Sequence, residues 1–173
     1  METINQAIIV HSPIGRLEVS AGPVGIRCLR ILAEGEPGAS SRPVGSQSAS
    51  PLLSQAAANI QAYFQRDVKS FSLPLDISGL GEFQRRVLEA VQTIPWGHIL
   101  TYAQLAGLID QPGAARAVGT ALARNPILLL IPCHRVIGSD QRMHGFASPD
   151  GTRTKEWLLR HEGHHIIEEK LLD

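Results

Sequence analysis

The sequence places a thiol beside an imidazole at Cys133 and His134, in the segment Ile-Pro-Cys-His-Arg-Val. A cysteine attacks as its thiolate, and an ordinary thiol has a pKa of about 8.5. A neighbouring imidazole that accepts the proton makes the thiolate available near neutral pH. The pair therefore indicates nucleophilic chemistry. The alternative for Cys133 alone is a plain buried cysteine, which is the commonest fate of a lone thiol.

The residues just before this pair, 127–131, form an apolar run that predicts a buried strand. Adjacent residues on an extended segment point to opposite faces. We therefore expect His134 to act on Cys133 through a turn or an intervening water, and not by direct contact.

The composition limits the classes of protein that this chain can represent. Its 173 residues are 43% hydrophobic, which is enough for one core or for two small ones. Sixteen basic and sixteen acidic residues cancel, so a nucleic-acid partner would have to meet a local patch. We find no leader and no long apolar stretch, so we expect a cytoplasmic protein with no membrane contact. The two cysteines, Cys28 and Cys133, should stay free, and neither has the spacing of a zinc ligand.

The first part of the chain reads as a small sheet with one helix. Turns at residues 13–15 and 22–23 separate three short apolar segments, which predicts an antiparallel meander. Residues 33–50 are rich in Gly, Ser and Pro and predict a long surface loop. Helical spacing follows over residues 53–64, and alternation over residues 71–77 predicts a half-buried strand. This unit should close near Gly79, which gives domains 1–79 and 80–173.

The second part reads as mainly helical. Apolar residues keep one face of residues 83–94, and the segment Pro95-Trp96-Gly97 ends that helix. Thr101 and Gln104 form a capping box, which predicts a short helix over residues 102 to about 109. A turn at residues 111–113 separates it from a helix over residues 114–125. Two short helices joined by a tight turn are typical of a helix-turn-helix, although most such pairs only fill a core.

The second of these helices has a flank that suits close contact with DNA. Small residues leave the flank almost bare, and Arg116 projects among them. A core helix would not tolerate an arginine at this place, whereas a DNA-binding helix would use it. Between residues 101 and 160 the basic residues also outnumber the acidic ones. They are Arg116, Arg124, Arg135, Arg142, Arg153, Lys155 and Arg160, against Asp110, Asp140, Asp150 and Glu156.

Five motifs together resemble the O6-alkylguanine-DNA alkyltransferases: "IPCHRVIG", "TYAQLAG", "PGAARAVG", "RNP" and "KEWLLRHEG". The match runs from about Phe83 to Gly163, and the first part matches in outline through "SPIG" and "AYFQ". The resemblance implies an α+β fold. A ribonuclease-H-like domain with a small antiparallel sheet would occupy residues 1–79. A mostly helical, winged-helix-like domain with the helix-turn-helix and the reactive cysteine would occupy residues 80–173.

The same resemblance implies roles for particular residues. Cys133 resembles the alkyl acceptor, His134 its water-mediated general base, and Glu162 the carboxylate that orients His134. Asn125 resembles the residue that ties the cysteine-bearing segment to the recognition helix, and Tyr102 the phenol that reaches ring nitrogen 3 of guanine and crowds the DNA backbone. The remaining roles concern the DNA and the base: Arg116 as the arginine finger, Ala115, Ala117 and Gly119 against the minor groove, and the carbonyls of Cys133 and Val136 as acceptors for the guanine amino group. Taken singly, Glu162, Tyr102 and Asn125 could also be a helix-end carboxylate, a core aromatic and a turn residue.

The implied activity is the direct repair of DNA. A monomer would bind double-stranded DNA, flip out an alkylated guanine and move the alkyl group from oxygen-6 to Cys133, once and irreversibly. Oxygen-4 of thymine would be a second target, and no metal, nucleotide or redox cofactor would be needed. Two alternatives are a DNA-binding module with a structural Cys133 and a cysteine hydrolase that uses Cys133, His134 and Glu162. The loop "GFASPDG" departs from the Gly-Tyr-x-Gly-Gly pattern of the family, with Phe146 in place of the tyrosine.

Overall fold

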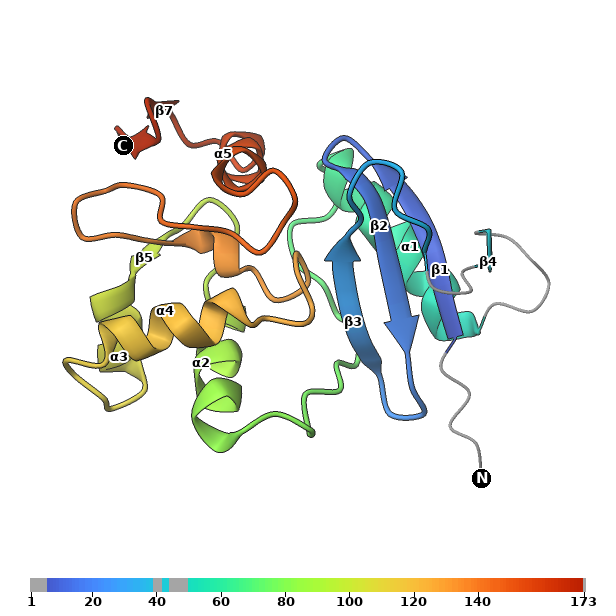
Figure 1. Cartoon of the computed structure of the whole chain (residues 1–173), viewed down its shortest axis with the longest axis horizontal. Coiled ribbons are helices and arrows are strands. Elements are labelled where there is room, and N and C mark those ends of the chain that lie inside the picture. The colour runs from blue at the N-terminus through green and yellow to red at the C-terminus, as the bar shows by residue number, and fades with distance from the viewer. Residues whose placement is uncertain (1–5, 39–41, 44–49, 173) are drawn as a thin grey trace. The chain divides into compact units, whose positions relative to one another are not determined.

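The computed structural model describes residues 6–38, 42–43 and 50–172, which form two compact units (Figure 1). The first unit runs to Gly79 and includes Pro126–Leu128, and the second contains Leu80–Asn125 and the chain from Leu129 onward. The return of residues 126–128 to the first unit rests on two backbone hydrogen bonds. Leu29 donates to the carbonyl of Pro126, and Leu128 donates to the carbonyl of Leu29, both at 2.9 Å.

The first unit contains a sheet of four strands in the order β3-β2-β1-β4. The predicted meander is confirmed as β1 (Gln6–Ser12), β2 (Gly15–Ala21) and β3 (Ile26–Ile31), which pair antiparallel. A fourth strand, β4 (Arg42–Pro43), pairs parallel with β1 inside the stretch that we predicted as a surface loop. Most of the rest of that stretch, residues 39–41 and 44–49, lies outside the described residues.

The helix α1 (Pro51–Phe64) packs on β1 and β2 and encloses the core of this unit (Figure 1). Ser50 caps it by accepting from the N–H of Leu53, and Pro51 occupies its first turn, where a missing N–H costs nothing. The core is formed by side chains that alternate along the strands and recur at helical spacing. Its buried residues include Ile8, Val10, Leu17, Val19, Ile26, Leu29, Leu53, Ile60 and Tyr63.

The strand predicted over residues 71–77 is wrong as an element. Only an isolated parallel bridge forms there, between Ile26 and Leu75, with hydrogen bonds from Ile26 to Pro74 and from Asp76 to Ile26, each 2.8 Å long. The alternating burial of this segment is real, but Pro74 has no N–H to donate, so the ladder cannot extend.

The second unit is built from helices. Its first three are α2 (Glu82–Gln92), α3 (Tyr102–Leu108) and α4 (Ala115–Ala123), which pack on one another. Thr101 caps α3 through both bonds of the predicted capping box. Gly113, with φ of +93°, makes the turn between α3 and α4. The predicted helix-turn-helix is therefore present, with Leu105, Val118 and Leu122 on the buried side.

Two very short strands link α3 to the cysteine-bearing segment. The strand β5 (Leu100–Thr101) directly precedes α3, and it pairs parallel with β6 (Val136–Ile137). The 3₁₀ turn η1 (Cys133–Arg135) directly precedes β6. This pairing brings Tyr102, the first residue of α3, close to Cys133, the first residue of η1.

The last helix, α5 (Thr152–His161), is followed by a hairpin of β7 (Ile166–Ile167) and β8 (Lys170–Leu171). The sequence did not predict this hairpin. Its Ile166 and Leu171 are buried in a cluster with Ile137, Met143 and Leu159. The predicted α+β class is confirmed, with a small sheet in the first unit and helices in the second. Within the described ranges, every helix is too short or too polar to cross a membrane.

Candidate active site

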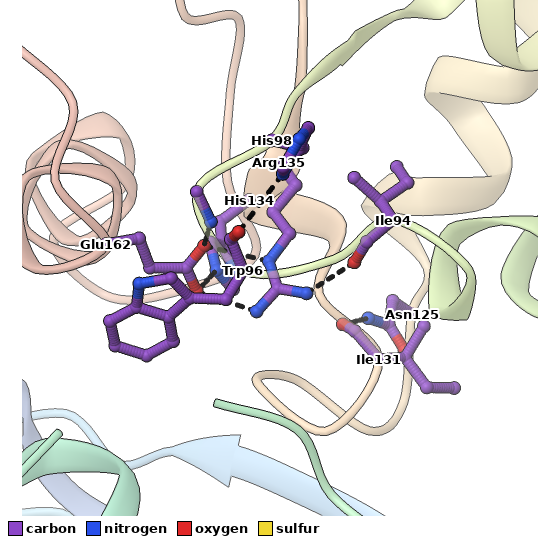
Figure 2. A network of polar contacts seen from close by, with 9 residues as sticks. Ile94, Trp96, His98, Asn125, Ile131, His134, Arg135 and Glu162 are labelled. Atoms are coloured by element: carbon purple, nitrogen blue, oxygen red, sulfur yellow. Dashed lines mark hydrogen bonds and ion pairs between the residues drawn. The ribbon is translucent and has the colours of Figure 1, made fainter. Parts of the chain in front are cut away.

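The segment before Cys133 is a buried turn and not the strand that we predicted. Residues 127–131 make only single bridges, and Leu129 has a left-handed φ of +68°, which breaks the extended run. The side-chain amide of Asn125 donates to the carbonyl of Ile131 at 3.0 Å (Figure 2). The N–H of Cys133 donates to the same carbonyl at 2.8 Å. These bonds hold the chain in a tight turn, so Cys133 and His134 lie on a 3₁₀ turn.

Glu162, at the end of α5, is the centre of a buried polar network (Figure 2). Its Oε1 lies 2.9 Å from Nε2 of His134 and accepts from Nη2 of Arg135 at 2.9 Å. Its Oε2 accepts from Nε of Arg135 at 2.8 Å. The third donor of Arg135, Nη1, reaches the carbonyl of Ile94 at 2.5 Å. One carboxylate thus binds a fork of Arg135 and fixes the His134 ring at the same time.

The charges of this network leave His134 as a neutral base. Burial lowers the pKa of His134, and the charge and hydrogen bond of Glu162 only partly oppose that effect. Burial would raise the pKa of Glu162, but the contacts with His134 and Arg135 outweigh burial and hold that pKa well below its usual range. Because Glu162 is ionised, the nitrogen of His134 that faces it carries the proton. Nδ1 of His134 is then the free acceptor, and it is buried with no hydrogen-bond partner among the described protein atoms.

Asn125 and Lys155 both favour the thiolate of Cys133, and Lys155 is the cation of the two. Burial raises the pKa of the Cys133 thiol, while a hydrogen bond to Asn125 and the charge of Lys155 lower it. Lys155 is itself only 1% exposed, and its Nζ donates to the carbonyl of Val136 at 2.6 Å. Burial lowers the pKa of Lys155 to about 8, and the nearby thiolate opposes that shift. The lysine is therefore still largely charged at neutral pH.

We expect the substitution Lys155→Met to raise the pKa of Cys133, because it removes the only cation among the groups that lower this pKa. Methionine keeps the length of the side chain, so the pocket should stay filled. The measurement is the rate of iodoacetamide alkylation against pH, with Cys28→Ser as the background so that only Cys133 reacts. The midpoint of the rate profile should move to higher pH.

The matched control is Lys170→Met, which removes an exposed lysine of β8 and should leave the midpoint unchanged. A second readout is the stability of the fold. Since the folded pKa of Lys155 is about 8 and its ordinary value is 10.5, the unfolded chain binds more protons between these two pH values. The wild type should therefore gain stability as pH rises through this window, and Lys155→Met should lose that gain. An unchanged midpoint would mean that the charge of Lys155 does not reach the thiolate.

Cys133 lies at a pocket of about 310 Å³ in the second unit. The pocket is lined by Tyr102 from α3, Gly119, Leu122 and Ala123 from α4, Lys155 from α5, and the loop residues His144, Gly145, Phe146 and Ala147. Burial raises the pKa of Tyr102 to about 12, and the neighbouring Cys133 adds to this effect, so the phenol stays protonated. Its O–H donates to the carbonyl of His144 at 3.1 Å. The pocket thus combines a thiol, a proton donor and a mainly apolar wall.

A wider groove of about 660 Å³ runs beside this pocket along α4. Of the residues predicted to meet DNA, Tyr102, Ala115, Arg116 and Gly119 line it, whereas Ala117 is exposed on the same helix outside its lining. Gly119 leaves the groove open beside Tyr102, since a Cβ there would lie 3.7 Å from the ring. The side chain of Arg116 is exposed, and it makes no hydrogen bond or ion pair with another described residue that would hold it back from a ligand in the groove.

The structure corrects the predicted basic patch. Arg135 and Lys155 are buried, at 5% and 1% exposure, and cannot contact DNA phosphates. Instead, Arg135 binds Glu162, which orients His134, and Lys155 binds the carbonyl of Val136 close to the thiol of Cys133. This carbonyl and that of Cys133, which accepts from the N–H of Val136, each keep a second lone pair. The described residues contain no cluster of three His, Cys, Asp or Glu side chains that could bind a metal ion.

Two family models match the chain. The model described as 6-O-methylguanine DNA methyltransferase, ribonuclease-like domain, covers residues 7–77. The model described as 6-O-methylguanine DNA methyltransferase, DNA binding domain, covers residues 82–164. A Methanosarcina barkeri protein named methylated-DNA–protein-cysteine methyltransferase is 39% identical over 158 residues, which cover 91% of this chain and 97% of that protein.

Solved structures give the same result. A crystal structure of a Mycobacterium tuberculosis O6-methylguanine methyltransferase aligns with a TM-score of 0.78 at 34% identity, over 92% of this chain and 93% of that chain. A crystal structure of the Mycobacterium tuberculosis OGT in complex with DNA aligns with a TM-score of 0.78 at 35% identity, over 91% of this chain and 92% of that chain. On these matches over nearly its whole length, the chain belongs to the 6-O-methylguanine DNA methyltransferase family.

Proposed function

We propose that this protein repairs DNA by moving an alkyl group from oxygen-6 of guanine to Sγ of Cys133. The observation that carries the proposal is the position of Cys133. It lines a pocket that has a phenol and a mainly apolar wall, and its neighbours are a neutral imidazole and a buried cation. Family membership agrees with it. The same chemistry would apply to oxygen-4 of thymine, since that oxygen is equally exposed once the base leaves the duplex.

The reaction is a displacement at the alkyl carbon. The thiol proton passes to Nδ1 of His134 through a water, the sulfur forms a bond to the alkyl carbon, and the carbon–oxygen bond breaks. Its electron pair goes to the guanine, which takes up the proton held on His134 through water and leaves as the normal base. The carboxylate of Glu162 stabilises the imidazolium while it exists, and Arg135 holds that carboxylate in place although its own charge opposes the imidazolium. The product is a thioether that no group in the site can reverse, so each molecule acts once.

Tyr102 and two carbonyls would recognise the base. The phenol is a donor at every physiological pH, because its pKa is about 12, and it can donate toward ring nitrogen 3 as negative charge builds on the guanine. The carbonyls of Cys133 and Val136 would accept from the amino group. Asn125 joins the end of α4 to the carbonyl of Ile131, and so holds the thiol in register with the DNA-facing helix.

The helix-turn-helix would present the groove along α4 to double-stranded DNA. Ala115, Ala117 and Gly119 let the helix approach the minor groove, and Arg116 would enter the stack in place of the flipped base. Flipping costs roughly a few kcal/mol and costs least for a mispaired base, which favours damaged sites. A monomer would suffice for this reaction, because Tyr102, Cys133, His134 and Glu162 are brought together within a single chain. We place the reaction in the cytoplasm, because a free thiol such as Cys133 persists in a reducing compartment.

The deciding experiment is mass spectrometry of the intact protein after incubation with DNA that contains O6-methylguanine. One stable methyl adduct on Cys133 supports the proposal. Tight binding of the DNA without an adduct would mean a binding module in which the thiol is structural. Repeated turnover of a thioester or ester substrate, again without an adduct, would mean a cysteine hydrolase.

We expect Arg116→Ala to slow transfer from duplex DNA by roughly tenfold or more, because the extruded state loses the group that fills the stack. Transfer from free O6-benzylguanine should change by less than about twofold, since the free base needs no extrusion. Single-turnover rates on the two substrates measure the difference. The control is Arg124→Ala, which removes an exposed arginine at the end of α4 that does not line the groove. Equal losses on both substrates would rule out the finger role.

A further inference from the structure

We propose that Glu169, in the turn between β7 and β8, is a positioning residue that sets which alkyl groups the pocket accepts. This inference rests on the proposed function. Glu169 does not line the pocket, but it contacts both ends of the loop that does. Its carbonyl accepts from the N–H of Met143 at 3.1 Å, and its Oε1 accepts from Oγ1 of Thr152 at 2.7 Å. The residues between these two contacts include His144, Gly145, Phe146 and Ala147, which form one wall of the pocket.

The hairpin that carries Glu169 is anchored to the second unit by packing and by hydrogen bonds. Ile166 and Leu171 are 4% and 2% exposed, in the cluster that also contains Met143. The N–H of Leu171 donates to the carbonyl of Gln141 at 3.0 Å, and a bridge joins Arg142 to Lys170. Both strands that flank Glu169 are therefore fixed in place. The contacts of Glu169 with Met143 and Thr152 should restrict the movement of the loop between them.

Glu169 also supplies what the start of α5 lacks. The N-cap of α5 is Gly151, which makes no side-chain hydrogen bond, and the first turn contains no acidic residue. The first turn of a helix is stabilised by a capping oxygen and by nearby negative charge. The carboxylate of Glu169 provides the negative charge from outside the helix, at the hydroxyl of Thr152 in the first turn. Because Lys155 lies in the same first turn, this contact positions a second part of the pocket.

The backbone of the turn gives an independent reason to assign a role to the side chain. Glu168 and Glu169 both have left-handed φ, at +49° and +60°. A two-residue hairpin turn of this kind normally contains Asn, Asp or Gly, because other residues are strained there. A strained glutamate is expected where its side chain has a use. Glu169 has one, whereas the carboxylate of the exposed Glu168 makes no contact with the described residues.

These features lead to a test with a matched pair of variants, Glu169→Gly and Glu168→Gly. Each relieves the same backbone strain, so both should fold, and Glu169→Gly should melt below Glu168→Gly only by the one bond that it loses. Only Glu169→Gly removes the bond to Thr152, which frees the loop and the first turn of α5. The freed wall can move outward for a large group, while a methyl group fits either way. The ratio of transfer rates, benzylated over methylated guanine, should therefore rise by roughly threefold, the scale of one hydrogen bond.

Two further variants of the full chain check the bond itself. Thr152→Val removes its donor and should reproduce the shift of Glu169→Gly, and Glu169→Gln keeps an acceptor and should stay near the wild-type ratio. The affinity for undamaged duplex DNA should be the same in all four variants. A wild-type ratio in both Glu169→Gly and Thr152→Val would overturn the inference, as would an equal shift in Glu168→Gly. Failure of the proposed function is distinct, because the wild type itself would then form no adduct.

Discussion

Replacing Cys133 with alanine should abolish alkyl transfer completely, since no other group at the pocket can attack the alkyl carbon. The rate should fall to that of the uncatalysed reaction, a loss beyond about a thousandfold. Binding to duplex DNA should stay within about twofold of the wild type, because the groove along α4 is formed by other residues. Adduct formation by mass spectrometry and DNA affinity at a fixed salt concentration measure the two effects.

Cys28→Ser is the control for this experiment. Cys28 lies on β3 in the first unit, where burial raises the pKa of its thiol and the charged groups that act on it among the described residues are Arg30 and Glu18, not an imidazole. The variant should form the adduct at the wild-type rate. Transfer that survives in Cys133→Ala, or disappears in Cys28→Ser, would show that the acceptor has been assigned to the wrong residue.

Glu162→Gln should cause the second large loss. Glutamine has nearly the same shape, but the guanidinium of Arg135 would remain buried without a counter-charge. Breaking a buried ion pair from one side costs about 3–5 kcal/mol, which urea unfolding would measure. The amide could also present its NH₂ to His134 and stabilise the wrong tautomer. We therefore expect transfer to slow by roughly a hundredfold or more, measured at saturating DNA.

Glu156→Gln on the same helix is the matched control, because it removes a partly exposed pair with Arg160 at 2.6 Å. Exposed pairs of this spacing are worth about 0.3–0.5 kcal/mol. The two variants should also differ in acid. Since the folded pKa of Glu162 lies below its ordinary 4.5, its contribution to stability is present above that pH and is lost as the pH falls further. Glu162→Gln should lack this acid-dependent loss, and a wild-type acid profile in that variant would contradict the network.

The sequence predicted those parts of the fold that depend on local signals. Turn residues separate the three long strands, and the capping box at Thr101 and Gln104 marks the start of α3. Prediction from the sequence failed where an element depends on a residue far away in the chain. Alternation over residues 71–77 could not show that Pro74 would limit the pairing to one bridge. The apolar run at residues 127–131 could not reveal the left-handed Leu129 that turns the chain. Strands of two residues, such as β4 and β7, have no period to detect.

The distinction between local signals and distant partners also applies to the residues of the site. Cys133 and His134 were found because they are neighbours with complementary chemistry, and the other roles came from motifs that resemble a known family. Arg135 and Lys155 were counted as surface charges, because their burial depends on Glu162 and Val136, far along the chain. One sequence signal could have raised doubt. Both residues lie within the apolar patterns around Val136 and Leu158, where a charged residue has to find a partner.

In the proposed reaction, Tyr102 would have to give up its hydrogen bond to the carbonyl of His144 in order to donate to the guanine. A phenol has a single O–H, so it cannot serve the loop and the guanine together. The loop contact and the affinity for the base are then thermodynamically linked, and each must weaken the other by the same factor. A substitution that strengthens the loop contact would reduce base affinity, and bound base would loosen the loop. Substrate entry would thus free the loop at the moment when the alkyl group has to be accommodated.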